Sequence, residues 1–218
     1  MERYFKLGDY NTYTDWDLIL TYKDVTHPKP KTNYVNLYGV DGTLDLSESL
    51  AGHVVYEDRT VSAAFWTDHG TRADRERLLR QIRQAIHGCK LNIVEPDDQD
   101  HYFIGRVNVK KEVNKLSYAE ISIECTCEPY RYRNEDTVRY FELTENETVN
   151  AVFHNTGRKT VIPSITTTSS VTITFNDSEV SLVAGTYKVP DLKIKPGVNT
   201  VGITGSGNIT FTYKEGDI

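Results

Sequence analysis

Three carboxylates at four-residue intervals are the side chains that most invite a catalytic interpretation: Glu120, Glu124 and Glu128. A strand rises about 3.3 Å per residue, so neighbours in this set would lie about 13 Å apart on one strand. Glycosidases that retain configuration need about 5 Å between their two carboxyl groups, and inverting ones need about 6.5–9.5 Å. The spacing therefore excludes a catalytic pair within this segment and favours a hydrated acidic face.

Residue types that bind metals and phosphates occur without the spacing that such sites need. The acidic run Glu95–Asp100 lacks the alternating ligands and the glycine of a calcium loop, which favours a solvated turn. Cys89, Cys125 and Cys127 form no C-x-x-C pair, so we expect neither a zinc site nor a disulfide framework. Gly202–Gly207 (GITGSG) precedes a strand-like segment instead of a helix, which predicts a hairpin turn and not a phosphate loop. We expect no catalytic residue, cofactor or metal.

The three carboxylates belong to the clearest periodic segment of the chain, Lys115–Glu128. Polar residues there alternate with a row of small apolar or sulfur side chains, namely Ala119, Ile121, Ile123, Cys125 and Cys127. A buried free cysteine behaves as a small hydrophobe, so both cysteines are predicted to lie in a core. Tyr102–Val109 is predicted as the other strand of a hairpin.

The sequence predicts a helix over residues 71–88. Apolar residues recur there at three- and four-residue spacing: Leu78, Leu79, Ile82, Ala85 and Ile86. Thr71, with Asp74 three residues later, is typical of an N-cap, and Gly88 is placed to end the helix. The arginines elsewhere on the helix are interleaved with Asp74 and Glu76, which favours a solvated or subunit-facing surface over a nucleic-acid site.

Length and charge narrow the class of protein. The chain has 218 residues and a formal net charge of −6, with acidic and basic residues mixed along it. A general nucleic-acid binder needs a basic footprint, so that class is not expected. The N-terminus has no apolar signal region, and the longest apolar run, Ala63–Trp66, is far too short for a membrane span. The sequence therefore predicts a soluble protein that is made in a cytoplasm.

The composition changes beyond Pro129–Arg133. The second half is rich in Thr, Val and Asn, and its apolar residues alternate with polar ones, as in Val171, Ile173 and Phe175. Many short strands with frequent turns predict an antiparallel sandwich. We therefore expect a mainly β protein with an N-terminal domain over residues 1–133 and a C-terminal β-sandwich over residues 134–218.

Several N-terminal segments, in order, resemble the distal tail protein family of long-tailed (siphovirus-type) bacteriophages and prophages. The central piece, Pro28–Trp66, is similar to the family's proline, strand, G-x-D-G, leucine-aspartate-leucine and serine segment and the strand after it. The other pieces resemble an opening strand with its tryptophan, a later strand and the end of the domain: Tyr13–Leu20, Tyr102–Val107 and Cys127–Arg133. Trp16 is expected to be a packed core or interface ring, with a stacking platform for a sugar or base as the alternative.

The resemblance implies an N-terminal β-barrel- or sandwich-like domain with one α-helix, and a C-terminal galectin- or carbohydrate-module-like β-sandwich. It also implies a hexameric ring at the virion tail tip, made in the host bacterial cytoplasm. The implied ring joins the tail tube protein to the tail fibre or hub protein and lets DNA pass without binding it specifically. A receptor-binding protein or a host glycan is the partner that the C-terminal domain would hold, and no membrane is involved.

Three sets of residues are candidates for these roles. Glu120, Glu124 and Glu128 would face the lumen of the ring, where like charge would keep DNA from sticking. The candidate subunit contacts lie on the proline-rich segment and the helix: Pro28, Pro30, Asp41, Gly42, Arg75 and Arg83. Tyr187 and Tyr213 are candidates for a sugar platform if the C-terminal half acts instead as a carbohydrate- or receptor-binding module. An enzyme is not expected, because no nucleophile–base set, metal ligands or carboxylate pair is recognisable.

Overall fold

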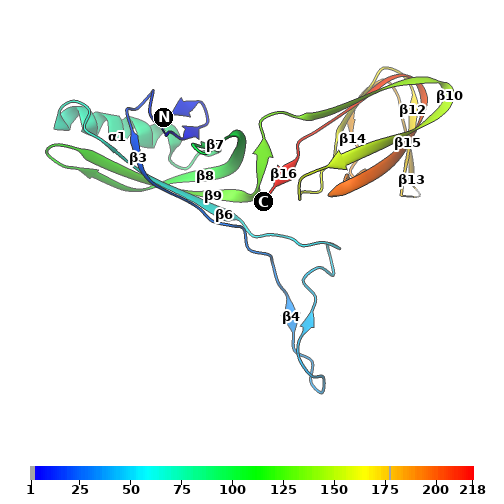
Figure 1. The fold of residues 1–218 in the computed structure, drawn as a ribbon, viewed down its shortest axis with the longest axis horizontal. Coiled ribbons are helices and arrows are strands. Elements are labelled where there is room, and N and C mark those ends of the chain that lie inside the picture. The colour runs from blue at the N-terminus through cyan, green and yellow to red at the C-terminus, as the bar shows by residue number, and fades with distance from the viewer. Residues whose placement is uncertain (1–2, 177) are drawn as a thin grey trace. The chain divides into compact units, whose positions relative to one another are not determined.

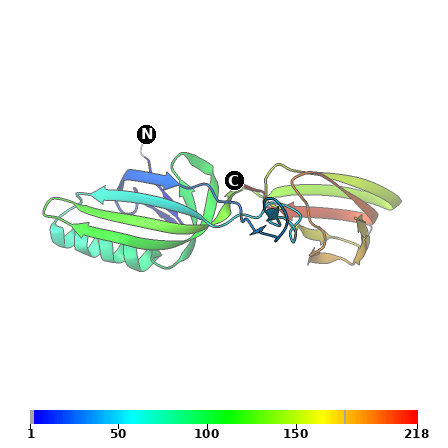
Figure 2. The same ribbon diagram turned by 90° about the horizontal axis from the view of Figure 1, so that it is seen from below.

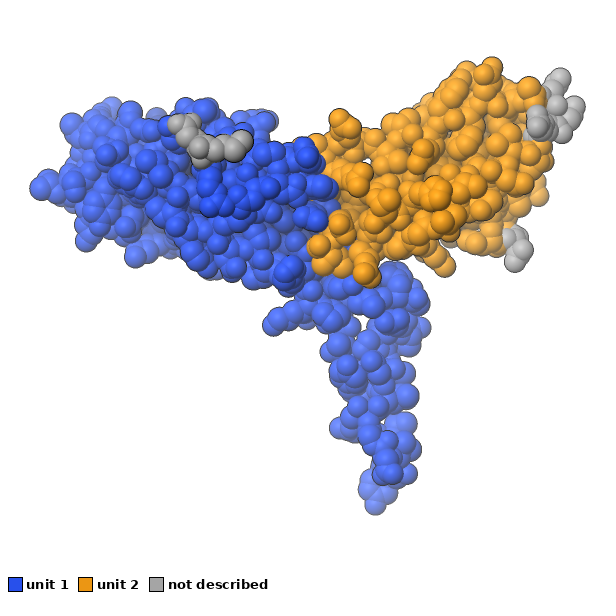
Figure 3. Space-filling model, in the orientation of Figure 1, with its two compact units in different colours: residues 1–131 blue, residues 132–218 orange. Residues whose placement is uncertain are grey.

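The computed structural model describes residues 3–176 and 178–218, without the side chains of residues 145–147. The chain divides into two compact units, residues 1–131 and residues 132–218, coloured separately in Figure 3. Both units are built mainly from β-strands, and among the described residues the helix α1 (Arg72–Ile86) is the only α-helix. The predicted mainly β fold class is confirmed.

Unit 1 is a twisted sheet with α1 packed on one face, as the view from below shows (Figure 2). The strands lie in the order β2-β1-β7-β8-β9-β6-β3. Their bounds are β1 Lys6–Leu7, β2 Tyr10–Asn11, β3 Ile19–Val25, β6 Arg59–Thr67, β7 Lys90–Glu95, β8 Asp98–Asn114 and β9 Ala119–Arg133. Neighbouring strands with resolved registers run antiparallel, and β8 and β9 form the long hairpin that was predicted.

Strict alternation along β6 and β9 builds the core under the helix. Odd-numbered residues of both strands are buried from Arg59 to Thr67 and from Ala119 to Cys127, and the even-numbered ones face away. Val61 lies opposite Cys125, and Phe65 lies opposite Ile121. Both cysteines are therefore core residues, as the sequence predicted.

The ends of α1 follow from its sequence. Thr71 is the N-cap: its hydroxyl accepts a hydrogen bond from Asp74 N, and the Asp74 carboxylate accepts one from Thr71 N, so both halves of a capping box are present. Gly88 follows the C-cap with φ +78°, a left-handed conformation that glycine adopts without strain. Leu79, Ile82 and Ile86 point into the core.

An arm, which we define as residues 26–58, leaves the sheet between β3 and β6 (Figures 1 and 3). It carries the short strands β4 (Tyr34–Val35) and β5 (Leu44–Asp45), which pair with each other. Backbone hydrogen bonds hold its base together, from Lys31 N to Val55 O (2.7 Å) and from Glu57 N to Lys29 O (2.8 Å). Gly42 has φ +79° at the tip, as expected for the predicted turn.

Unit 2 is an antiparallel assembly built on two long strands, β10 (Thr137–Asn155) and β15 (Gly197–Tyr213), which pair along most of their length. The first half of β15 also pairs with β12 (Val171–Phe175), and its second half with β11 (Ser164–Thr167). The remaining strands are β13 Ser178–Leu182, β14 Gly185–Lys188 and β16 Gly216–Asp217. Phe153, Phe211 and Ile203 are buried in the core of this unit.

Two local predictions were wrong. Gly202–Gly207 is not a hairpin turn, because β15 runs through it; the register shifts there, and Gly205, with φ +152°, lies against the backbone of Ser170 and Val171. Tyr13–Leu20 is not one strand. Tyr13–Trp16 form a turn, Asp17 has φ +52°, and β3 begins only at Ile19. Trp16 is nevertheless buried and stacks on Tyr10 at a centroid distance of 5.0 Å, which agrees with a packed ring.

Candidate functional site: interaction surfaces

The acidic run and the cysteines singled out in the sequence form no metal site or catalytic set in the described residues. No group of three or more His, Cys, Asp or Glu is placed to hold a metal among the residues that the structure describes. In the acidic run, Asp97 pairs with Arg3 (2.5 Å) and Lys23 (2.7 Å), and hydrogen bonds from these two cations lower the pKa of Asp97 to about 2. The run is a salt-bridged β7–β8 connection that ties the N-terminal segment to the sheet. No helix in the described ranges has the length and apolarity of a membrane span.

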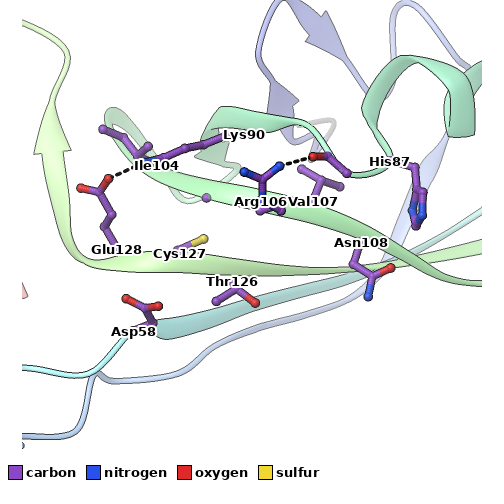
Figure 4. Close-up of a pocket in the computed structure, with 12 residues that line it drawn as sticks. Asp58, His87, Lys90, Ile104, Arg106, Val107, Asn108, Thr126, Cys127 and Glu128 are labelled. Carbon is purple, nitrogen blue, oxygen red and sulfur yellow. Dashed lines mark hydrogen bonds and ion pairs between the residues drawn. The ribbon is translucent and has the colours of Figure 1, made fainter.

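A groove of about 630 Å³ in unit 1 lies between the end of α1 and strands β8 and β9 (Figure 4). Its polar groups bind each other: Lys90 Nζ pairs with Glu128 Oε1 at 2.9 Å, and Arg106 donates to the Gly88 carbonyl at 2.5 Å. Cys127 also lines the groove, but burial raises the pKa of its thiol to about 12. A thiol that stays protonated at neutral pH is a poor nucleophile, so the position of Cys127 favours packing over catalysis.

Glu120, Glu124 and Glu128 lie on the face of the sheet opposite α1, since their neighbours in sequence are the buried residues of β9. The face is less acidic than the sequence alone predicts. Glu124 pairs with Lys110 and Glu128 with Lys90, both at 2.9 Å, so lysines from β8 and β7 offset two of the three carboxylates. The face is therefore one of mixed charge.

Arg75 was predicted as a subunit contact, and the structure contradicts this. Its side chain is 2% exposed and its guanidinium donates to the carbonyls of Gly70 (2.7 Å), Lys115 (3.2 Å) and Leu116 (2.7 Å). These bonds join the start of the helix to the tip of the β8–β9 hairpin. Arg75 is therefore an internal brace, and the arginine faces the core because it precedes Leu79 and Ile82 by four and seven residues.

The other candidate contacts differ in exposure. Pro30, Asp41 and Gly42 are exposed on the arm, whereas Pro28 is buried. Arg83 is about half exposed on α1 and pairs with Glu112 of β8 at 2.6 Å. The exposed candidates therefore remain predictions as subunit contacts.

The arm carries the largest concentration of exposed apolar side chains in the chain. Seven large apolar residues between positions 34 and 54 are exposed: Tyr34, Leu37, Tyr38, Val40, Leu44, Leu50 and Val54. Tyr38 and Leu50 are as exposed as in an extended chain. Large exposed apolar clusters mark sites of interaction with other molecules. The sequence singles out this segment, but nothing in the sequence predicts that its apolar residues are exposed.

The proposed sugar platform in unit 2 loses one of its two rings. Tyr213 is 4% exposed and donates a hydrogen bond to the His154 carbonyl at 3.5 Å, so its ring cannot stack on a sugar. Tyr187 is half-buried and packs against the core. The alternation of Tyr213 with Phe211 and Ile209 was the signal for its burial.

Comparison with known proteins identifies the fold. No protein-family model matches the sequence, and no curated protein matches it. The structure is similar to the crystal structure of SPP1 Dit (gp 19.1), a protein described as a paradigm of the hub adsorption apparatus in phages that infect Gram-positive bacteria. The match covers 97% of this chain and 98% of that one, with a TM-score of 0.72 and 14% sequence identity. The resemblance predicted from the sequence is thus confirmed for the fold.

Proposed function

We propose that this chain is a structural component of a bacteriophage tail tip. The observation that carries the proposal is the likeness to a tail hub protein over nearly the full length of both chains, which extends through both compact units. A shared fold alone does not fix a function, because one fold can serve many. Here the predicted sequence segments, the matching fold and an arm with exposed apolar residues agree on an assembly role.

In this proposal six copies form a ring at the tail tip, made in the host bacterial cytoplasm and carried on the virion. The ring joins the tail tube protein to the fibre or baseplate protein, and the genome passes through its centre. Identical subunits with a head-to-tail contact close into a ring when the rotation permits, which suits a chain with an exposed edge strand such as β3. The number six comes from the family resemblance.

The face with Glu120, Glu124 and Glu128 is our candidate for the channel wall. Two of the three carboxylates there are offset by Lys90 and Lys110, so the face offers DNA neither a strong positive field nor a binding site. A wall of this kind would let DNA pass without holding it. A ring structure with this face on the outer rim would remove this part of the proposal.

Immunogold electron microscopy tests the role directly. Antibodies raised against the purified chain are expected to label one end of the tail in virions from the phage that encodes it. Label on the capsid, or no label on intact virions in which the chain is detected by mass spectrometry, would contradict a tail-tip position. Antibodies against another virion protein of known position serve as the control.

A receptor-binding role for the C-terminal unit is the alternative, and its glycan form is weakened by the burial of Tyr213. Binding of residues 132–218 to a glycan array would support it. The glycan-binding role would be contradicted if that fragment bound no glycan on the array more strongly than an unrelated β-sandwich protein does. A protein partner on this unit would instead be found by capture with a purified receptor-binding protein.

A further inference from the structure

The tip of the arm is acidic, and no other part of the same unit that the structure describes covers it. Between Thr32 and Gly52 the charged residues are Asp41, Asp45 and Glu48, with no lysine or arginine among them. The same segment exposes two aromatic rings, Tyr34 and Tyr38, and several aliphatic side chains. A surface that matches this tip must therefore offer positive charge together with apolar or stacking groups.

The arm does not bury its apolar side chains by folding back on its own unit. Its base is a ladder of backbone hydrogen bonds, which continues to Leu46 N and Asn33 O (2.8 Å) near the tip. In Figures 1 and 2 it projects away from α1 and from the covered face of the sheet. An extended run from Val25 to Asp41 reaches up to about 50 Å. The apolar tip is thus carried beyond the surface of its own unit, where another molecule can reach it.

The outer face of α1 has the matching chemistry. Arg72, Arg77, Arg80 and Arg83 are exposed on it, and no ion pair joins Arg72 or Arg80 to any residue that the structure describes. Glu76 lies on the same face, four residues from both Arg72 and Arg80, and the half-buried Leu78 and Ala85 lie on the other flank of the buried stripe. Guanidinium groups pair with carboxylates and stack on tyrosine rings, which a lysine does less well.

The lysines of the sheet are poorer partners for the tip. Lys90 and Lys110 on the face opposite α1, and Lys23 of β3, are each within ion-pair distance of a carboxylate of the same unit. An incoming carboxylate would compete with those pairs, whereas Arg72 and Arg80 on the helix have none to lose. Charge complementarity therefore favours α1 over the open sheet face.

We propose that the arm tip of one copy lies across the arginine face of α1 in the next copy. This deepens the proposed ring and rests on it: the contact is head-to-tail, so repeating it closes a ring without leaving an unused arm. Asp41 and Glu48 meet the guanidinium groups, and the rings of Tyr34 and Tyr38 cover the arginine stems. The proposal assigns a partner, a second copy of this chain, to a surface that its own unit leaves bare.

Paired charge reversals test the contact. The arm variant Asp41→Lys/Glu48→Lys and the helix variant Arg72→Glu/Arg80→Glu change only exposed side chains, and Asp45 is left alone because it caps the turn through Ser47. Each variant alone is expected to weaken self-association by at least about tenfold. The variant with all four changes is expected to regain the mass of the wild type in light scattering coupled to size exclusion. Lys188→Glu/Lys193→Glu, on exposed positions of unit 2, is the matched control and should assemble normally.

Two results would overturn the inference. The first result takes either of two forms. Both double variants keep the wild-type mass, or the variant with all four changes fails to self-associate although its circular dichroism and melting temperature match those of the wild type. In the second, the wild type has the mass of one chain at every concentration while antibodies still label the tail tip. That pair of findings would contradict both the contact between copies and the ring, and would leave only the tail-tip position standing, with a different tail protein as the partner of the arm. Self-association without antibody label at the tail tip would contradict the proposed function and leave the contact between copies standing.

Discussion

The arm and the helix-covered sheet of unit 1 use the same apolar residue types for opposite purposes. Along β6, and along β9 as far as Cys127, every second side chain is buried, and Phe65 packs edge-on against Phe5 at a centroid distance of 6.0 Å. In the arm Tyr38 and Leu50 touch no core at all. The sheet gains its stability from burial, at roughly 25 cal/mol for each Å² of apolar surface. The apolar side chains of the arm gain no such stabilisation within the unit, and the proposed contact would bury them against a second copy.

Matched truncations give the largest expected contrast between the two regions. Phe65→Ala removes a buried ring and is expected to lower the free energy of unfolding by about 3–5 kcal/mol. Leu50→Ala removes an exposed side chain and should change it by less than about 0.5 kcal/mol. Urea unfolding followed by tryptophan fluorescence reports on unit 1, because Trp16 and Trp66 both lie there. Similar losses for the two variants would show that the arm packs on the unit in solution.

Loss of the Arg75 brace is expected to have the next largest effect on the free energy of unfolding. Arg75→Met keeps an apolar stem but leaves three carbonyls without their charged donor, which is expected to cost about 2–3 kcal/mol. Arg80→Met, on the exposed face of the same helix, should be nearly neutral for unfolding. Urea midpoints of the isolated variants check this. Equal midpoints, with normal hydrogen exchange at the β8–β9 tip, would show that the brace is dispensable.

Gly105 tests how tightly β8 and β9 approach each other. A methyl group there would overlap Cys127 Sγ and lie 2.9 Å from the Thr126 carbonyl oxygen, so Gly105→Ala is expected to cost about 1–3 kcal/mol. Gly202→Ala in unit 2 is the control, since its nearest contact would be an ordinary 3.5 Å to Thr174 Cβ. Scanning calorimetry of the whole chain measures both. A lower melting temperature for Gly202→Ala than for Gly105→Ala would contradict the packing.

The smallest effect near neutral pH concerns the cysteines. Burial raises the pKa values of Cys125 and Cys127, the latter to about 12, so the folded state favours the protonated thiols. This contribution to stability is complete below the ordinary thiol pKa of about 8.5 and is lost as pH rises from there toward 12. Alkylation at pH 8 should therefore modify the half-buried Cys89 and spare the other two. Rapid labelling of Cys127 in the folded chain would show that the core opens.

Local periodicity predicted much of unit 1. The alternation in β9, the burial of its cysteines and both ends of α1 could be read from residue order, because each depends on contacts within one strand or one turn. The apolar positions of the helix also contained the signal for Arg75, which lies in the same stripe as Leu79 and Ile82. An arginine in that stripe must find hydrogen-bond acceptors inside the unit. The prediction of Arg75 as a subunit contact overlooked this.

Features that depend on distant partners could not be predicted. The stretch Gly202–Gly207 resembles a turn, but pairing with β10 and β12 keeps it in β15. The left-handed Asp17 interrupts a segment whose composition favours a strand. Ion pairs from β7 and β8 to Glu128 and Glu124 changed the charge of the sheet face. The arm is the clearest case, because seven of its large apolar residues stay exposed although their types favour burial.

The native mass of the purified chain, by light scattering across a concentration series with negative-stain imaging of any large species, tests the central claim most directly. We expect an assembly of about six chains of 24.8 kDa, seen as a ring with an open centre. A mass of one chain at every concentration, with no rings in the images, would contradict assembly as the function of this fold in this protein.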